Sequence, residues 1–210
     1  MALTVGTNCG FVSVAPTADP NLSYTYNLNS NAASSIFVSP AGAAKITEIG
    51  WWCSNDTEEA DFDVGVYTDA GAGEPEALVG KETVAKGTTA GWKKATGLNI
   101  SISASTNYWL AVQSDNTAAI DYTFASNPYY AQKASLTELP IDWASSSSKG
   151  NGIRYAIYAV WEAAATGTKF QVNIGDSWKA VSAMKVNIGD SWKAVASAKV
   201  NIGDSWKTIF

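Results

Sequence analysis

The sequence predicts an all-β protein in which a jelly-roll-like β-sandwich is followed by a C-terminal module of repeated β-hairpins. Three observations indicate this class. Short stretches alternate apolar and polar residues, Gly, Asn, Asp and Ser turns separate those stretches, and one 14-residue segment is written three times. We expect the sandwich over 1–162, a linker over 163–168 and the repeats over 169–210. No segment shows the sustained apolar period that is typical of an amphipathic helix.

The strands of the sandwich are predicted from this alternation. Phe62, Val64 and Val66 occupy every second position of one stretch, as in a half-buried strand. About eight such strands separated by turns favour a sandwich of jelly-roll type. The main candidate strands cover 46–52, 61–67, 98–103, 108–113, 120–124 and 154–161.

The end of the chain is repetitive. The segments QVNIGDSWKAVSAM, KVNIGDSWKAVASA and KVNIGDSWKTIF share the heptapeptide NIGDSWK, and Trp178, Trp192 and Trp206 are each 14 residues apart. Agreement at this level indicates internal repetition, and each copy has the pattern of a β-hairpin.

The turn of each hairpin can hold two or three residues. In the middle copy, a three-residue loop makes Ile188 face Trp192 and collects the apolar residues on one face. A two-residue turn instead pairs Ile188 with Ser191 and scatters them over both faces. Because the buried face sets strand register, we expect the three-residue loop.

A single hairpin of this length needs a neighbour. Two strands are marginally stable in water, and a Trp side chain can bury roughly 200 Å². We therefore predict an oligomerisation or docking module, in which the chain binds copies of itself, with a trimer favoured. A duplication that only lengthens the tail, and ligand binding by the Asp-Ser loops, remain as alternatives. The predicted assembly residues are Val172, Ile174, Trp178, Val186, Ile188, Trp192, Val200, Ile202 and Trp206.

The composition argues against most catalytic chemistry. The chain has no histidine, which is the usual general acid or base near neutral pH and a common metal ligand. Carboxylate chemistry remains open, but we predict no enzyme and no cofactor. The 14 Lys and Arg against 19 Asp and Glu leave a net charge of −5. Without a basic cluster, nucleic acid is not an expected partner.

The N-terminal region indicates where the protein is made. MALTVGTNCGFVSV lacks the basic and apolar regions of a signal peptide, and no apolar run is long enough for a membrane span. We expect synthesis in a host cytoplasm. Cys9 and Cys53 lie among apolar neighbours, so we expect two small buried side chains rather than a disulfide, which that compartment disfavours.

Two stretches carry a resemblance to a known family. FDVGVYTDAGAGEPEALVG and GWKKATGLNISISASTNYWLAVQSD resemble a jelly-roll module of phage and bacterial surface proteins, and the NIGDSWK tail looks like C-terminal repeats of phage structural proteins. The resemblance implies a virion component, either a capsid decoration protein or a head-fibre or tail-fibre part. Its partner would be a capsid or tail protein, and it would act in the extracellular particle. It transfers no catalytic residue.

Carbohydrate binding, in a host-adhesion module, is the alternative function. Exposed aromatic faces stack on sugar rings, and the chain has nine Trp and nine Tyr. The competing interpretation buries these side chains between sheets or at subunit contacts. The candidate residues for binding surface glycans are Trp52, Trp92, Trp109, Tyr129, Tyr130 and Trp143.

Acidic residues suggest two further sites. Asp56, Glu58 and Asp61 are calcium candidates, although they lack EF-hand spacing, and Asp61 and Asp63 fit the solvent face of a strand. A glycosidase needs two carboxylates a few ångströms apart. Glu48, near two Trp residues, and the acidic stretch itself are the candidates, but nothing in the spacing selects them. We therefore expect no metal site and no glycosidase.

Overall fold

The computed structural model describes residues 3–55 and 58–164 and, for the backbone, six four-residue stretches between 171 and 208. All the secondary-structure elements of this described part are strands, which confirms the all-β class. The chain divides into two compact units, Met1–Ala164 and Ala165–Phe210. No helix of the described part is long and apolar enough to cross a membrane.

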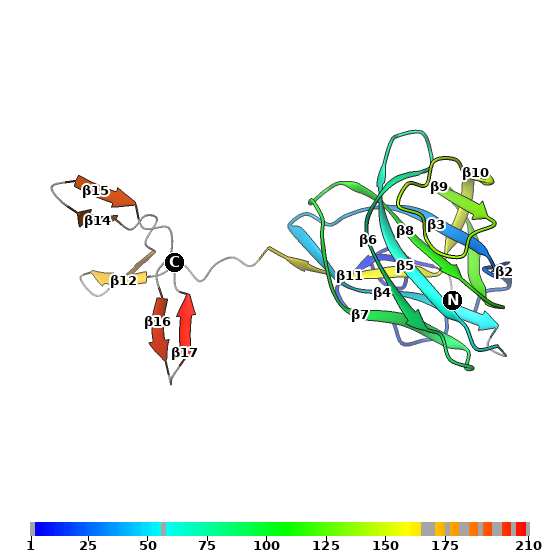
Figure 1. Cartoon of the computed structure of the whole chain (residues 1–210), viewed down its shortest axis with the longest axis horizontal. Coiled ribbons are helices and arrows are strands. Elements are labelled where there is room, and N and C mark those ends of the chain that lie inside the picture. Colours follow the sequence, from blue (N-terminus) through cyan, green and yellow to red (C-terminus); the bar gives the residue numbers. More distant parts are fainter. Residues whose placement is uncertain are drawn as a thin grey trace. The chain divides into compact units, whose positions relative to one another are not determined.

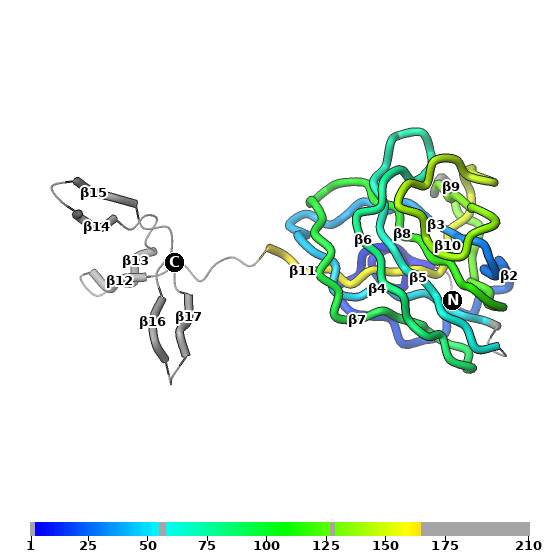
Figure 2. Tube along the Cα trace, in the orientation of Figure 1, coloured from blue at the N-terminus to red at the C-terminus, as the bar shows by residue number. Residues whose placement is uncertain are grey.

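The first unit is one curled sheet of eleven strands (Figures 1 and 2). Its main path runs β1-β11-β4-β9-β3-β8-β5-β6, with β7 paired to β4 and with β2 and β10 paired to β9. β1 and β11 are parallel, and the other pairs are antiparallel. The strands are β1 (Gly10–Val12), β2 (Tyr24–Asn27), β3 (Asn31–Val38), β4 (Ala43–Asn55), β5 (Asp61–Asp69), β6 (Pro75–Ala85), β7 (Gly91–Ser101), β8 (Asn107–Ser114), β9 (Ala119–Ala134), β10 (Ser148–Tyr155) and β11 (Ile157–Ala163).

The long strand β9 makes the sheet curl. At its beginning Ile120 pairs with Cys53 of β4, and towards its end Ala131 pairs with Ser34 of β3. One strand thus joins two layers that face each other. At the other side β6 and β7 are not hydrogen-bonded neighbours in the described sheet, so the curl stays open there as a half-barrel.

The main core lies inside the curl. Phe62, Val64 and Val66 of β5 point into it, as their alternation predicts, and each is almost fully buried. Across the interior Trp51 of β4 packs edge-on against Phe62, with ring centroids 5.6 Å apart. Burial of a large apolar side chain stabilises the fold by roughly 2 kcal/mol, so this face supplies the main driving force of the unit.

A second apolar cluster covers the outer face of the same sheet. Tyr67 and Trp109 lie there as a cross-strand pair of β5 and β8. The connection between β9 and β10 places Leu139 and Trp143 over them, and the rings of Tyr67 and Trp143 are 5.2 Å apart. β8 is therefore buried on both faces, whereas its sequence alternation predicts only one.

Asp63 holds that covering connection in place. Its carboxylate accepts hydrogen bonds from the Leu139 amide at 2.8 Å and the Thr83 hydroxyl at 2.6 Å, and it forms an ion pair with Lys81 at 3.1 Å. The Tyr67 hydroxyl adds a bond to the Pro140 carbonyl at 2.7 Å. The expectation that Asp63 lies on a solvent face is wrong, because the 135–147 connection covers it and leaves it 3% exposed.

In the second unit the strands pair two by two, each pair forming a two-stranded sheet. Ile188 pairs with Ser191 and Asn187 with Trp192, and the other two pairs repeat this register. The three-residue loop that we predicted is therefore wrong. Two-residue connections match the natural twist of paired strands, and that preference outweighs the collection of apolar residues on one face. The pairs are β12 (Gln171–Ile174) with β13 (Ser177–Ala180), β14 (Lys185–Ile188) with β15 (Ser191–Ala194), and β16 (Lys199–Ile202) with β17 (Ser205–Thr208).

Replacing Asp63 by Ala should destabilise the first unit strongly. The substitution leaves the Leu139 amide without its acceptor and Lys81 without its buried partner, so we expect the free energy of unfolding to fall by about 3 kcal/mol. Urea unfolding of the full chain, followed by circular dichroism, measures this. The exposed Asp61 on the same strand, changed to Ala, is the control and should cost no more than about 0.5 kcal/mol. Equal losses for the two variants would contradict the role given to Asp63.

Candidate functional site

Two of the predicted glycan-binding residues are buried. Trp109 and Trp143 are both 0% exposed, because the 135–147 connection closes over the outer face of the sheet. Their indole nitrogens are used internally: Trp109 donates to Asp69 at 3.1 Å and Trp143 to Ser146 at 2.9 Å. The expectation that these two side chains are exposed is wrong, and neither ring face is available to a sugar.

Trp52 and Trp92 are half-buried and form a cluster with the fully buried Tyr158. The Trp52 and Trp92 rings meet edge to face at 5.5 Å, and Trp92 meets Tyr158 at 5.1 Å. The Trp92 indole nitrogen donates to the Ala18 carbonyl at 2.9 Å. Much of the surface of these rings is therefore buried against the neighbouring rings, and the segment around Ala18 covers part of the cluster.

The remaining two candidates lie on β9. Tyr130 is half-buried and packs beside Gly150, where an added Cβ would lie 3.3 Å from the ring. Tyr129 is 49% exposed. Of the six predicted aromatic residues, Tyr129 alone has about half of its surface open to solvent.

Glu48 is engaged in a structural contact. Its carboxylate accepts a hydrogen bond from the Tyr158 hydroxyl at 2.6 Å and lies 3.8 Å from the Lys94 ammonium. The Tyr158 ring lies so close over Gly50 that a Cβ there would approach it to 2.5 Å. Burial, and then the bond to Glu48, raise the pKa of Tyr158. The partners of this carboxylate are thus a tyrosine and a lysine rather than the second acid that a glycosidase uses.

The acidic stretch does not assemble into a metal centre in the described part of the chain. Glu58 and Asp61 are exposed, and Asp56 lies outside the described residues. Beside Asp61, the Asp115 carboxylate accepts the Asp61 amide at 2.9 Å. No three His, Cys, Asp or Glu side chains gather in a metal-binding group among the described residues.

The two cysteines are buried and are not joined by a disulfide. Burial raises the pKa of the Cys9 thiol from 9.0 to about 12, and the positive charge of Arg154 opposes this in part. Because the thiolate is the reactive form, Cys9 is a packing residue at neutral pH.

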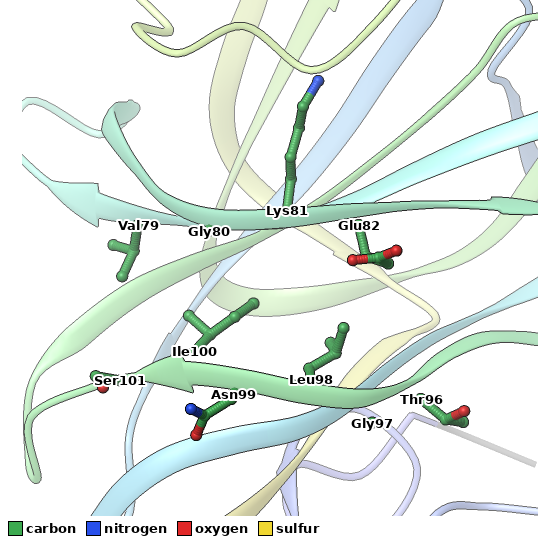
Figure 3. A pocket seen from close by; sticks show the side chains of 10 residues that line it. All are labelled: Val79, Gly80, Lys81, Glu82, Thr96, Gly97, Leu98, Asn99, Ile100 and Ser101. Carbon is green, nitrogen blue, oxygen red and sulfur yellow. The ribbon is translucent and has the colours of Figure 1, made fainter.

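A cleft of about 590 Å³ lies along the open side of the half-barrel, between β6 and β7 (Figure 3). At its floor Ile100 faces Gly80, where a Cβ would lie only 3.0 Å from the Ile100 side chain. Lys81 points away from the cleft, towards Asp63 and Glu138. Glu82 is the one carboxylate among the described residues that line it, so those residues offer no pair of acids. Its residues are Val79, Gly80, Lys81, Glu82, Thr96, Gly97, Leu98, Asn99, Ile100 and Ser101.

An exposed aromatic cluster lies elsewhere, where β2 pairs with β9. We call Tyr24, Tyr122 and Phe124 the rim patch. Tyr24 and Tyr122 are cross-strand partners and stack with ring centroids 5.6 Å apart. Phe124 meets Tyr24 edge to face at 4.9 Å and Tyr122 at 5.8 Å. Tyr24 is 50% exposed and Phe124 61%.

Sequence reasoning missed the rim patch. The signal is local alternation, with aromatic residues at every second position of Tyr24–Asn27 and again of 121–124. Nothing in the sequence says that these two segments, about a hundred residues apart, become neighbouring strands. Pairing them places the aromatic residues side by side.

The predicted assembly residues lie on β12–β17. The described backbone places them in the three strand pairs, and their side chains lie outside the described part of the chain. The residues are Val172, Ile174, Trp178, Val186, Ile188, Trp192, Val200, Ile202 and Trp206.

Comparison with known proteins identifies no relative. No family model, no curated protein and no solved structure matches this chain.

The buried tyrosines predict alkaline destabilisation. Burial raises the pKa of Tyr67, Tyr155 and Tyr158 in the folded protein. A raised pKa stabilises the folded state below the unfolded pKa, about 10 for tyrosine, and this contribution is lost as the pH rises above it. We expect the free energy of unfolding to be steady from about pH 7 to 8 and to begin to fall at about pH 8.5, where the Cys9 thiol of the unfolded chain ionises. Above about pH 10 the tyrosines add a fall of up to about 1.4 kcal/mol per pH unit for each such group.

Urea unfolding at a series of pH values measures this slope. Tyr67→Phe removes one titrating group and should make the fall above about pH 10 shallower. Equal stability at about pH 7 and pH 11 would contradict the prediction.

Proposed function

We propose that the chain is a non-enzymatic structural protein of a phage-like particle, a capsid decoration or fibre component, that self-assembles and attaches through its repeats. The observation that carries the proposal is the form of the second unit: three strand pairs with one register, each a separate two-stranded sheet. Such a pair is marginally stable alone. Since the chain contains three such strand pairs, we infer that another surface packs against them.

We also propose a specific fold for each of the two units. We take the half-barrel as a jelly-roll-like domain and the strand pairs as a module of β-hairpin repeats. The resemblance of 62–80 and 91–115 to jelly-roll modules of phage and bacterial surface proteins supports the particle context. The partners would be copies of the chain, in a trimer, and a capsid or tail protein. The protein would be made in a host cytoplasm and would act in the extracellular virion.

The tryptophans of the repeats should carry the self-association. Replacing Trp178, Trp192 and Trp206 together by Ala removes the largest apolar side chain of each repeat, so we expect the oligomer to dissociate. Sedimentation equilibrium measures the mass, and circular dichroism reports whether the first unit stays folded.

A matched control changes the neighbouring lysine of each repeat, Lys179, Lys193 and Lys207, to Ala and should keep the oligomer. Truncation after residue 164 should give a folded monomer. The assembly role of the repeats would be contradicted if the triple Trp variant, or the truncated chain, still formed an oligomer with the same number of copies as the full-length protein.

A carbohydrate-binding or host-adhesion module is the second candidate. The rim patch favours it, because three aromatic side chains gather at one surface place and two of them are at least half exposed. Single exposed aromatic residues are ordinary, whereas exposed apolar patches often mark binding sites.

A broad glycan array probed with the full-length protein tests this second function. We expect reproducible binding to a group of related glycans, since aromatic stacking selects ring shape before detailed substitution. The triple Lys variant of the repeats serves as a control that should bind equally. An array without any reproducible signal would retire the adhesion function and leave the assembly function standing.

A further inference from the structure

We propose that the rim patch is the binding platform for a neutral oligosaccharide, with Tyr24 and Phe124 as the residues that contact the sugar rings. This inference rests on the second proposed function and assigns its site. The six aromatic residues that the sequence suggested are not part of this site.

The rings of the rim patch hold one another in place. Tyr24 stacks on Tyr122 with an interplanar angle of 26°, and Phe124 stands at 69° to Tyr24 and at 90° to Tyr122. The patch therefore presents ring surfaces in two nearly perpendicular orientations. Side chains fixed before binding lose little conformational freedom when a ligand arrives.

The patch is anchored in the interior. Tyr122 packs edge-on against Tyr155 at 5.9 Å, and Tyr155 is fully buried. Gln132 donates a hydrogen bond to the Tyr155 hydroxyl. Tyr26, two residues from Tyr24 on β2, packs against the same Tyr155 ring. A continuous aromatic row thus connects the core to the exposed rings and restrains their position.

The chemistry of the patch fits an uncharged ligand. Its three members carry no formal charge, and the nearest acid in sequence, Asp121, is 3% exposed and so is not offered to solvent. A tyrosine combines an apolar ring with a hydroxyl that can hydrogen-bond. A pyranose ring likewise combines an apolar C–H face with a polar rim of hydroxyls, so the two surfaces match.

The size of the patch favours a sugar over a second copy of the chain. An aromatic side chain contributes about 150–250 Å² when fully buried. With Tyr24 50% and Phe124 61% exposed and Tyr122 partly covered, the patch offers roughly 300 Å². A stable protein interface needs about 800 Å² from each partner, whereas one or two sugar rings cover an area of this size.

The test uses the full chain and a panel of soluble neutral oligosaccharides, namely maltohexaose, cellohexaose, chitohexaose and mannohexaose, with isothermal titration and saturation-transfer NMR as readouts. We expect at least one of them to bind. Tyr24→Ala and Phe124→Ala should each weaken that binding about tenfold, and Tyr24→Phe, which keeps the ring, should weaken it by less than about threefold.

Tyr129→Ala is the matched control, because Tyr129 is 49% exposed and lies on the same strand outside the rim patch. It should leave binding unchanged. Tyr24 and Phe124 are both exposed, so their variants should keep the circular dichroism spectrum and thermal midpoint of the parent protein. Both quantities are measured alongside the binding.

The outcomes separate the site from the function. Sugar binding that persists in both Ala variants would overturn the rim patch as the site and leave the adhesion function standing. Binding to no member of the panel, combined with a silent glycan array, would overturn both. Loss of self-association in Phe124→Ala, or binding of a proline-rich peptide in place of any sugar, would also overturn the proposal.

Discussion

The buried carboxylate of Asp63 is the constraint on which the outer face of the sheet depends. A charge removed from water must be paired or fully hydrogen-bonded, and Asp63 meets this need with Lys81, Thr83 and the amide of Leu139. The last of these partners belongs to the 135–147 connection. The segment that completes the hydrogen bonding of the carboxylate is therefore the same segment that covers the outer face of the sheet.

That cover decides which aromatic residues face solvent. Tyr67 and Trp109 would present wide apolar surfaces if the connection were absent, and with it they pack against its own Trp143 as a second core. At the other end of β9 nothing in the described part of the chain covers the junction with β2, where Tyr24 and Phe124 remain exposed. The distribution of exposed rings thus follows from the route of one connection rather than from the number of aromatic residues.

The sequence was sufficient to predict the fold class, but it did not reveal which faces of the strands are buried. Alternation in 61–67 and 108–113 predicted strands correctly, because a period of two is a property of the strand itself. It could not reveal that Asp63 and Trp109 are covered, since the cover comes from a segment that is distant in sequence. The rim patch was out of reach for the same reason: each half of it looks ordinary until Tyr24 pairs with Tyr122.

The repeats show the same limit at a smaller scale. Identity of the heptapeptide revealed three equivalent units, yet the register followed the short connection rather than the apolar pairing of Ile188 with Trp192. In the described backbone each strand pair is a separate two-stranded sheet, whereas the half-barrel encloses one core and covers a second face. A unit with its own core is stable alone and can offer a small preformed surface to a ligand. A strand pair that is only marginally stable needs a larger surface to pack against. On this physical ground we propose recognition as the role of the first unit and assembly as the role of the repeats.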